Sequence, residues 1–447
     1  MTHIKPGLIL FLGFGLLLSC SKDEKIIQGI DLELQSLIKN ASPSSDLSYF
    51  ILPQSDNFSA IPQDPKNPIS KEKVALGGFL FHETALGVGG NENSTRKTYS
   101  CASCHHASAG FQSGTFQGIG EGGTGFGVRG ELRKPFIGLT NVDVQSLKTP
   151  SVMNGAYQPN QLWNGQSGAT HLNNGTKPLW KEGSDLAMNH LGYEGLETQA
   201  ISGLGVHRLK LDENIIKMSA YKKLFDEAFH DKNASERYSN ENAGLAIAAY
   251  LRTLLSNQAP FQKYLRGESN ALNEIEKRGA ALFFGKAQCA SCHTGPALNS
   301  MQFNAIGLGD LVDCPEPTLK TIQNDPVNLG RGGFTQNHEE YYAFKVPQLY
   351  NLKDVQFYGH GSSKRSIKEM IVYKNLAIAE NKNVPASHLD PLFKPLGLTD
   401  KEIDALTTFI TNSLYDPNLR RFEPQQLPSG LCFPNADVQS RIDMDCF

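Results

Sequence analysis

Cys101-Ala102-Ser103-Cys104-His105 is the stretch that decides the fold, and the same five residues recur in the same order at positions 289–293. Two thiols three positions apart, followed at once by a histidine, are typical of covalent attachment of a c-type haem. Each cysteine can form a thioether to a haem vinyl group, and the histidine can supply the proximal ligand to the iron. We therefore predict two c-type haems, attached through Cys101, Cys104, Cys289 and Cys292 and ligated by His105 and His293.

Composition alone does not explain the repeated motif. With 8 cysteines and 12 histidines in 447 residues, chance would give about 0.004 copies of the pattern, and the chain holds two. Paired cysteines can also form half-sites for structural zinc or redox-active dithiols. Neither alternative explains a histidine directly after both second cysteines.

A similar helical run precedes each motif. Residues 74–81 read Val-Ala-Leu-Gly-Gly-Phe-Leu-Phe, and residues 277–284 read Lys-Arg-Gly-Ala-Ala-Leu-Phe-Phe. Repetition of a helix, an aromatic pair and a haem motif predicts a mainly α fold of two tandem cytochrome c-type domains, each wrapped around one covalently bound c-type haem. A capping-box pattern at 399–402, followed by apolar residues at helical spacing, predicts the last helix of the second domain.

The length of the chain is sufficient for two domains with full-sized cores. Breaks in composition predict a signal peptide over 1–19, an N-terminal tether over 20–64, a first haem domain over 65–266, a second over 267–425 and a C-terminal tail over 426–447. The net charge of -3 gives no support for a nucleic-acid partner, because such proteins usually carry a strongly basic face.

The N-terminus has the features of an export signal. Lys5 precedes an apolar run over 7–18 that is too short to span a membrane. Residues 17–20 resemble a bacterial lipobox, in which Cys20 would be diacylated, and residues 20–24 resemble the acidic surface-export signal of Bacteroidota lipoproteins. We expect an exported protein, lipid-anchored to the outer membrane and facing the periplasm or the cell surface. The alternative is a plain signal peptide with an incidental cysteine.

Three cysteines remain outside the haem motifs and the lipobox. Export permits disulfides, and Cys432 and Cys446 flank a short tail rich in Pro, Asn and Asp. We predict a bridge between them that fastens the C-terminus, which leaves Cys314 as the odd thiol.

Residues from about 65 to 415 resemble the bacterial dihaem cytochrome c peroxidases and the related MauG-type enzymes. In that family the first haem is peroxidatic, the second transfers electrons, and a tryptophan between them mediates; the matching residue here is Trp163, for which core packing is the alternative role. The motifs that carry the resemblance are the two haem motifs, Leu76-Gly-Gly-Phe-Leu-Phe81, Gln161-Leu-Trp-Asn-Gly165, Leu196-Glu-Thr-Gln-Ala200 and the run from Phe344 to Gly361.

The distal residues of the first haem depart from the family pattern. Where many members have a histidine in a Gly-His-Gly-like stretch, residues 118–122 carry Glu121. About ten residues beyond its Gln-Ala pair the family has a glutamate, and this chain has His207 and Arg208. Peroxide cleavage needs a group that takes a proton and returns it. We expect His207 in that role, with Glu121 as the alternative and Arg208 stabilising the departing hydroxide; a histidine without any catalytic part is the simplest alternative.

The resemblance also implies a distal ligand for the second haem. The family's T-x-P run is replaced here by residues 355–357, and counting forward from it leads to Tyr373. MauG-type members have a tyrosine ligand at this place. Met370, one helical turn earlier, is the alternative. The family's interdomain calcium uses an Asn side chain and backbone carbonyls of that run. Backbone oxygens do not depend on residue type, so one calcium ion remains an open expectation.

The resemblance implies that hydrogen peroxide is reduced to water with electrons from a small donor protein, a cytochrome c or a cupredoxin. Electrons would enter at the second haem and pass by Trp163 to the first. One alternative is a MauG-type enzyme that oxidises a residue on a partner protein, and another is a dihaem electron-transfer protein without peroxidase activity. A homodimer is an expected assembly.

Overall fold

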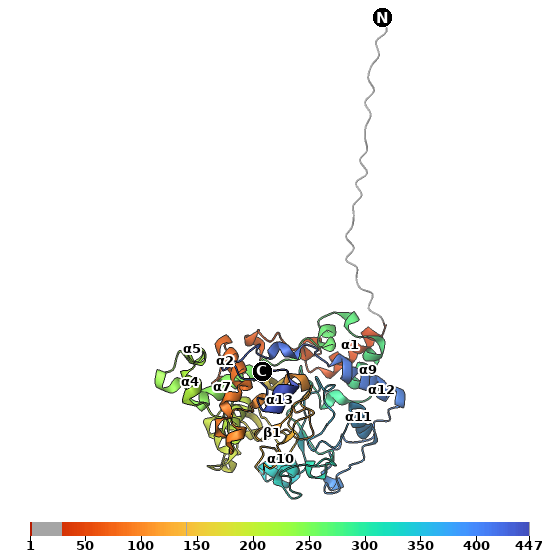
Figure 1. Ribbon diagram of the computed structural model, residues 1–447. Coiled ribbons are helices and arrows are strands. Elements are labelled where there is room, and N and C mark those ends of the chain that lie inside the picture. Colours follow the sequence, from red (N-terminus) through yellow and green to blue (C-terminus); the bar gives the residue numbers. More distant parts are fainter. Residues whose placement is uncertain (2–28, 140, 447) are drawn as a thin grey trace.

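The computed structural model describes Met1 and residues 29–139 and 141–446. It is mainly helical, as the sequence predicts, with two pairs of very short strands (Figure 1). The predicted signal peptide and Cys20 lie outside the described residues. Among the residues described, no helix is both long and apolar enough to cross a membrane.

The helices follow one another along the chain with long irregular connections. They are α1 (Gly29–Ala41), α2 (Lys71–His82), α3 (Gly195–Val206), α4 (Glu213–Lys217), α5 (Ser219–Ala228), α6 (Ala234–Arg237), α7 (Asn240–Arg252), α8 (Pro260–Leu265), α9 (Glu274–Phe284), α10 (Gly330–Thr335), α11 (Ile367–Leu376), α12 (Asp400–Thr408) and α13 (Val438–Asp443). The antiparallel strand pairs are β1 (Gly123–Thr124) with β2 (Lys134–Pro135), and β3 (Phe303–Asn304) with β4 (Phe344–Lys345).

The first hydrophobic core lies where α2 and α3 pack on α7. Helix α2 begins after Ser70, whose side chain accepts a hydrogen bond from the amide of Lys73 at 3.2 Å, a standard N-cap. Gly77 permits the close crossing of α2 and α7, because a Cβ there would lie 1.9 Å from the carbonyl oxygen of Ala246. The helix that leads to the first haem motif is thus fixed against the last helix of its domain.

The second core repeats this arrangement with α9 packed on α12. Gly279 takes the place of Gly77, since a Cβ there would lie 2.1 Å from the carbonyl oxygen of Ala405. In both helices a buried phenylalanine follows four residues later, Phe81 in α2 and Phe283 in α9. The internal repeat seen in the sequence is therefore also a repeat of helix packing. The predicted capping box forms at the start of α12.

The segment expected to be an N-terminal tether is ordered from Gly29 and belongs to the second core. Leu34 and Ile38 of α1 are fully buried, and Asp31 forms a buried ion pair with Lys277 of α9 at 2.9 Å. Figure 1 shows α1 beside α9. An amphipathic helix buries its apolar face wherever a matching surface exists, and hydrophobic periodicity does not reveal which domain offers it. Residues 255–265 likewise pack in the second core, so the division between the cores falls before 266.

The C-terminal tail returns to the first domain. A disulfide joins Cys432 to Cys446, and Ser100 and Ser103, at the first haem motif, both donate to the carbonyl oxygen of Pro434 at 2.9 and 3.2 Å. Asp437, just before α13, pairs with buried Arg133 at 3.3 Å. The tail therefore covers the segment that carries the first haem motif.

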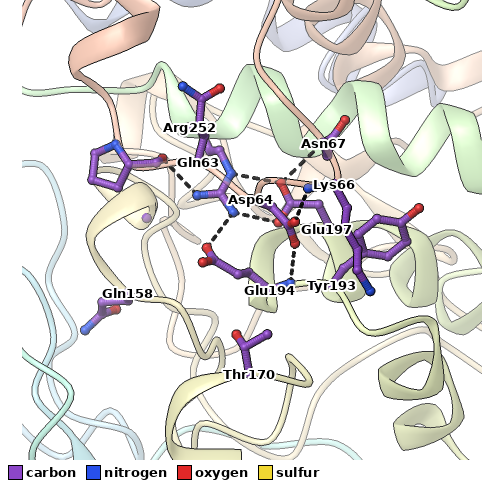
Figure 2. Close-up of polar contacts among 12 residues, drawn as sticks. Gln63, Asp64, Lys66, Asn67, Gln158, Thr170, Tyr193, Glu194, Glu197 and Arg252 are labelled. Carbon is purple, nitrogen blue, oxygen red and sulfur yellow. Dashed lines mark hydrogen bonds and ion pairs between the residues drawn. The ribbon is translucent and has the colours of Figure 1, made fainter.

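A buried ion cluster joins α3 and α7 to the chain before α2 (Figure 2). Arg252 binds both carboxylate oxygens of Glu197, at 2.9 and 2.7 Å, and also reaches Glu194 at 2.9 Å and the carbonyl oxygen of Pro62 at 2.9 Å. The side chains of Arg252 and Glu197 are 2% and 0% exposed. With nearly every donor of the guanidinium paired, this cluster holds the first core together.

Replacing Arg252 with Met should lower the free energy of unfolding by about 3–5 kcal/mol, because Glu197 would remain buried without its partner. Denaturant unfolding measures the effect. The double variant Arg252→Met/Glu197→Gln should recover part of the loss. Arg278→Ala, which removes an exposed ion pair with Glu274, should cost less than about 1 kcal/mol. Equal effects of the two single substitutions would contradict the role given to Arg252.

Candidate active site

The first haem motif lies between α2 and a glycine-rich loop. Cys101–Ser103 forms a single 3-10 turn, and the ring of His105 lies 6.5 Å from that of Phe81 in α2. The Nδ1 atom of His105 lies 3.3 Å from the carbonyl oxygen of Phe111. On the other side, a Cβ at Gly118 would lie 3.1 Å from the Cys104 sulfur. The glycine-rich loop over residues 110–130 thus borders this site closely.

The second motif opens into a cavity. Cys289–Ser291 forms another 3-10 turn, and Nδ1 of His293 lies 3.1 Å from the carbonyl oxygens of both Leu298 and Pro347. A cavity of about 320 Å³ lies beside these residues, and Cys289, Cys292 and His293 line it together with side chains from the first domain. The two sites are therefore not isolated from each other.

Both histidines fit the role of iron ligand. A carbonyl oxygen only accepts, so Nδ1 of each ring must donate, which leaves the Nε2 lone pair of His105 and of His293 free for a metal. Burial lowers the pKa of each of these histidines to about 4, so the neutral, metal-binding form is present at pH 7. The four motif cysteines are free thiols in the structure. The donor set therefore fits two covalently attached haems.

The zinc alternative needs several such ligands at one point. Within residues 29–139 and 141–446, no group of three or more His, Cys, Asp or Glu side chains lies close enough to hold a metal ion.

Trp163 is held between the two domains. Its indole Nε1 donates to the carbonyl oxygen of Lys148 at 2.7 Å, while the amide of Lys148 donates to the carbonyl oxygen of His360 at 2.8 Å. The amide of Lys345 in β4 donates to the carbonyl oxygen of Trp163, also at 2.8 Å. Trp163 lines the cavity that holds the second motif.

The turn that carries Trp163 is conformationally demanding. Leu162 has φ of 71°, which is uncommon for a residue with a branched side chain, and Gly165 has φ of 68°. A Cβ at Gly165 would lie 2.5 Å from the ring of Phe303 in β3. The motif Gln-Leu-Trp-Asn-Gly thus encodes one fixed turn that packs against the second domain, and its glycine cannot be replaced without displacing Phe303.

His207 is paired with an aspartate that the sequence did not single out. Helix α3 ends at Val206, and Nδ1 of His207 lies 2.8 Å from an oxygen of Asp143. Burial lowers the pKa of His207, but the Asp143 carboxylate raises it more, so this pKa lies above its usual value. With Nδ1 bound by the aspartate, Nε2 remains as the position for proton transfer.

Glu121 is paired with Arg208, the neighbour of His207. Its side chain is 2% exposed and accepts hydrogen bonds from the amide of Asn91 at 2.5 Å, from the hydroxyl of Thr95 at 2.6 Å and from Nε of Arg208. The Nη2 atom of Arg208 is buried and has no hydrogen-bond partner among the described residues. Glu121 is thus saturated with donors, whereas Arg208 retains one free donor.

A short backbone pairing places Glu121 and Asp143, the two acidic partners, side by side. The amide of Gly120 donates to the carbonyl oxygen of Asp143, and the amide of Asp143 donates to that of Glu121, both at 2.9 Å. Arg208 adopts φ of 55° just beyond α3. Because the helix has ended there, consecutive residues 207 and 208 can face neighbouring carboxylates, which they could not do inside a helix.

The two candidates for the distal ligand of the second haem differ in position. Met370 in α11 lines the same cavity as His293. The hydroxyl of Tyr373 donates to the carbonyl oxygen of Ile306 at 2.5 Å, and its ring faces the ammonium of Lys364 at 4.5 Å. Of these two residues, Met370 lines the cavity and Tyr373 does not.

Comparison with known proteins places these features in a family. The profile of the family described as di-haem cytochrome c peroxidase matches residues 71–270. MauG, the methylamine utilization protein of Methylorubrum extorquens, is 27% identical over 360 residues, which cover 80% of this chain and 82% of that protein. The cytochrome c peroxidase Ccp of Escherichia coli is 28% identical over 308 residues, 69% of this chain and 54% of that protein.

The chain belongs to the di-haem cytochrome c peroxidase family, which includes the MauG proteins. It is an oxidoreductase of that family, and membership implies two c-type haems. The fold agrees. A crystal structure of a MauG-like protein associated with microbial copper homeostasis superposes with a TM-score of 0.57 at 23% identity, over 82% of this chain and 95% of that one.

Several residues of this di-haem site were not found by sequence reasoning. Asp143 lies 64 positions from His207, and Asn91 and Thr95 lie well before Glu121, so no spacing rule connects them. Lys148 had one signal, a lysine directly before Thr149 and Pro150 in an otherwise apolar and small-residue stretch.

Met370→Leu and Tyr373→Phe test the second haem's distal ligand. We expect Met370→Leu to convert a low-spin ferric haem to high spin, because it removes the thioether that lines the cavity, while Tyr373→Phe keeps the ring volume and leaves the signal unchanged. Electron paramagnetic resonance of the ferric protein distinguishes them. A lost low-spin signal in Tyr373→Phe alone would assign the ligand to Tyr373.

Proposed function

We propose that the chain is an exported dihaem enzyme that reduces hydrogen peroxide to water with electrons from a small redox protein. The proposal rests on two haem-attachment motifs, each of which has a histidine whose Nε2 is free to bind iron. Trp163, which hydrogen bonds hold from both domains, lies between them. Electrons would enter at the second site and pass by Trp163 to the first. Trp163 lines the cavity beside the second motif, which places it next to the site where electrons would enter.

The bound haems would supply the redox chemistry, passing to peroxide two electrons taken from the donor protein. The protein's own part is to move protons. His207 would take a proton from one peroxide oxygen and return it to the other, which leaves as water. Two electrons from the donor and two protons from solvent would then convert the remaining oxygen to the second water. Asp143 would keep the imidazole oriented, with Nδ1 as donor and Nε2 as the working atom.

Arg208 and Glu121 fit different parts in this scheme. The free Nη2 donor of Arg208 supports a role in stabilising a departing hydroxide. Glu121 already accepts three short hydrogen bonds, so we propose that it fixes Arg208 rather than relaying protons. A carboxylate engaged in this way also competes poorly for an iron, so we propose that one face of the first haem is open in the fully ferric protein.

A MauG-type reaction, oxidation of a residue on a partner protein, is the second candidate. Its support is the similarity to MauG, 27% identity over 80% of this chain, beside 28% identity to a peroxidase. Product analysis separates the two, because a peroxidase consumes a donor cytochrome c or cupredoxin stoichiometrically and needs no other protein.

The N-terminal sequence supports attachment to the membrane by a lipid on Cys20. Residues 29–61 pack on the second core, so an acyl chain at Cys20 would hold the protein by the side that carries α1. Release of Cys20→Ser from the membrane fraction would agree with this proposal, and unchanged retention would count against it. A homodimer also remains a proposal, which size measurement in solution tests.

The His207–Asp143 pair leads to a kinetic prediction. The ferric protein should show one high-spin haem and react with peroxide without prior reduction, and His207→Ala should slow that reaction by about 10²–10⁴ while both haems stay bound. Stopped-flow absorbance measures the rate. His230→Ala, at an exposed position, is the matched control and should have no effect.

Asp143→Asn adds a pH test of the same pair. Burial and the charge of Arg208 lower the pKa of His207. The carboxylates of Asp143 and Asp185 raise it, and the net effect is a raised pKa. Without it the pKa falls, so neutral His207 persists to lower pH and the acid limb of the rate profile should move to lower pH. An unmoved limb together with an unchanged rate in His207→Ala would shift the proton transfer to Glu121.

A further inference from the structure

Lys148 is a buried lysine with almost no partner. Its side chain lies on the wall of the cavity that contains Trp163 and His293, and the residue is 3% exposed. Within residues 29–139 and 141–446, the only hydrogen bond from its ammonium goes to the carbonyl oxygen of Ser113, at a long 3.4 Å. Burial lowers the pKa of Lys148 to about 7, and among the described residues no carboxylate lies within ion-pair distance of it.

Three other buried lysines have closer partners than Lys148 does, and one of them, Lys364, pairs with Glu380. Lys277 pairs with Asp31 at 2.9 Å, and Lys345 donates to the carbonyl oxygen of Asn160 at 2.8 Å. Burying an ammonium without a strong partner is unfavourable. Lys148 is therefore buried without an anionic partner, and no carboxylate of the described residues supplies one.

The position of Lys148 indicates where that anion comes from. Its backbone lies between the two sites, since its carbonyl oxygen accepts from Trp163 and its amide donates to His360. Its charge also acts on His105, where it adds to the lowering of the pKa by burial. The charge of Lys148 thus acts at the first attachment site, while the residue also lines the cavity beside the second. The propionate side chains are the anionic groups of a haem.

We propose that Lys148 binds a propionate carboxylate of a haem in the space between the two attachment sites. The inference rests on the proposed binding of two haems. Either haem can supply the carboxylate, and the test below identifies which. An ammonium beside the porphyrin stabilises the reduced iron, which carries less positive charge, and so raises the reduction potential of that haem.

The same ammonium bears on the calcium expected from the family resemblance. Residues 355–357 replace the family's calcium run, and Phe357 lines the cavity together with Lys148. A calcium ion in this region would be another positive charge between the sites, so the test below includes a calcium chelator.

The experiment compares Lys148→Met, Lys148→Arg and the exposed-site control Lys353→Met in the haem-loaded protein. Spectroelectrochemical titration gives the potential of each haem, and covalent haem content and thermal unfolding check that each variant is intact. We expect one potential to fall in Lys148→Met and to be kept in Lys148→Arg and in Lys353→Met. The haem whose potential falls is the one that Lys148 binds.

Three results would overturn the inference. Two bound haems with both potentials unchanged in Lys148→Met would show that no propionate depends on Lys148, while leaving the proposed function intact. A shift of the unmodified protein's potentials on treatment with a calcium chelator would show that a metal ion supplies the charge instead. An unmodified protein without two covalent haems would defeat the proposed function as well.

Discussion

The peptide unit around Lys148 is the constraint on which the relation between the two sites depends. Its carbonyl oxygen fixes the indole of Trp163 at 2.7 Å, and its amide is fixed by His360 of the second domain at 2.8 Å. A tryptophan can serve two cofactors only if neither domain moves relative to it. The left-handed turn at Leu162 and the close approach of Gly165 to Phe303 add to this fixation. Trp163, for which we propose a mediating role, is thus held by hydrogen bonds and packing from both domains.

The first site is organised around two neighbouring charge pairs. The end of α3 turns His207 toward Asp143 and Arg208 toward Glu121, and a backbone pairing keeps both acids adjacent. One pair leaves an imidazole nitrogen free and the other leaves an arginine donor free. The residues proposed for proton transfer and for stabilising a hydroxide therefore lie on the same short segment of chain, and in a partly buried setting their charges act strongly.

The sequence predicted the features that are local. The two haem motifs, the helices before them and the capping box at Thr399 all follow from spacing within about a dozen residues, and the structure has these helices and this cap. Features that need distant segments to meet were not predictable. Asp143 meets His207 across 64 positions, α1 packs on α9 rather than forming a tether, and the tail contacts Ser100 and Ser103. The periodicity of a sequence does not predict such long-range contacts, because they depend on how the helices pack in the folded protein.

The account depends above all on covalent haem at both motifs. Mass spectrometry of the denatured, reduced protein and of its peptides measures this directly, since thioether bonds survive conditions that strip non-covalent haem. The account predicts a mass increase of two haems per chain, with one haem on the peptide that holds Cys101 and Cys104 and one on the peptide that holds Cys289 and Cys292. Peptides of unmodified mass at either motif, or zinc in place of haem, would contradict it.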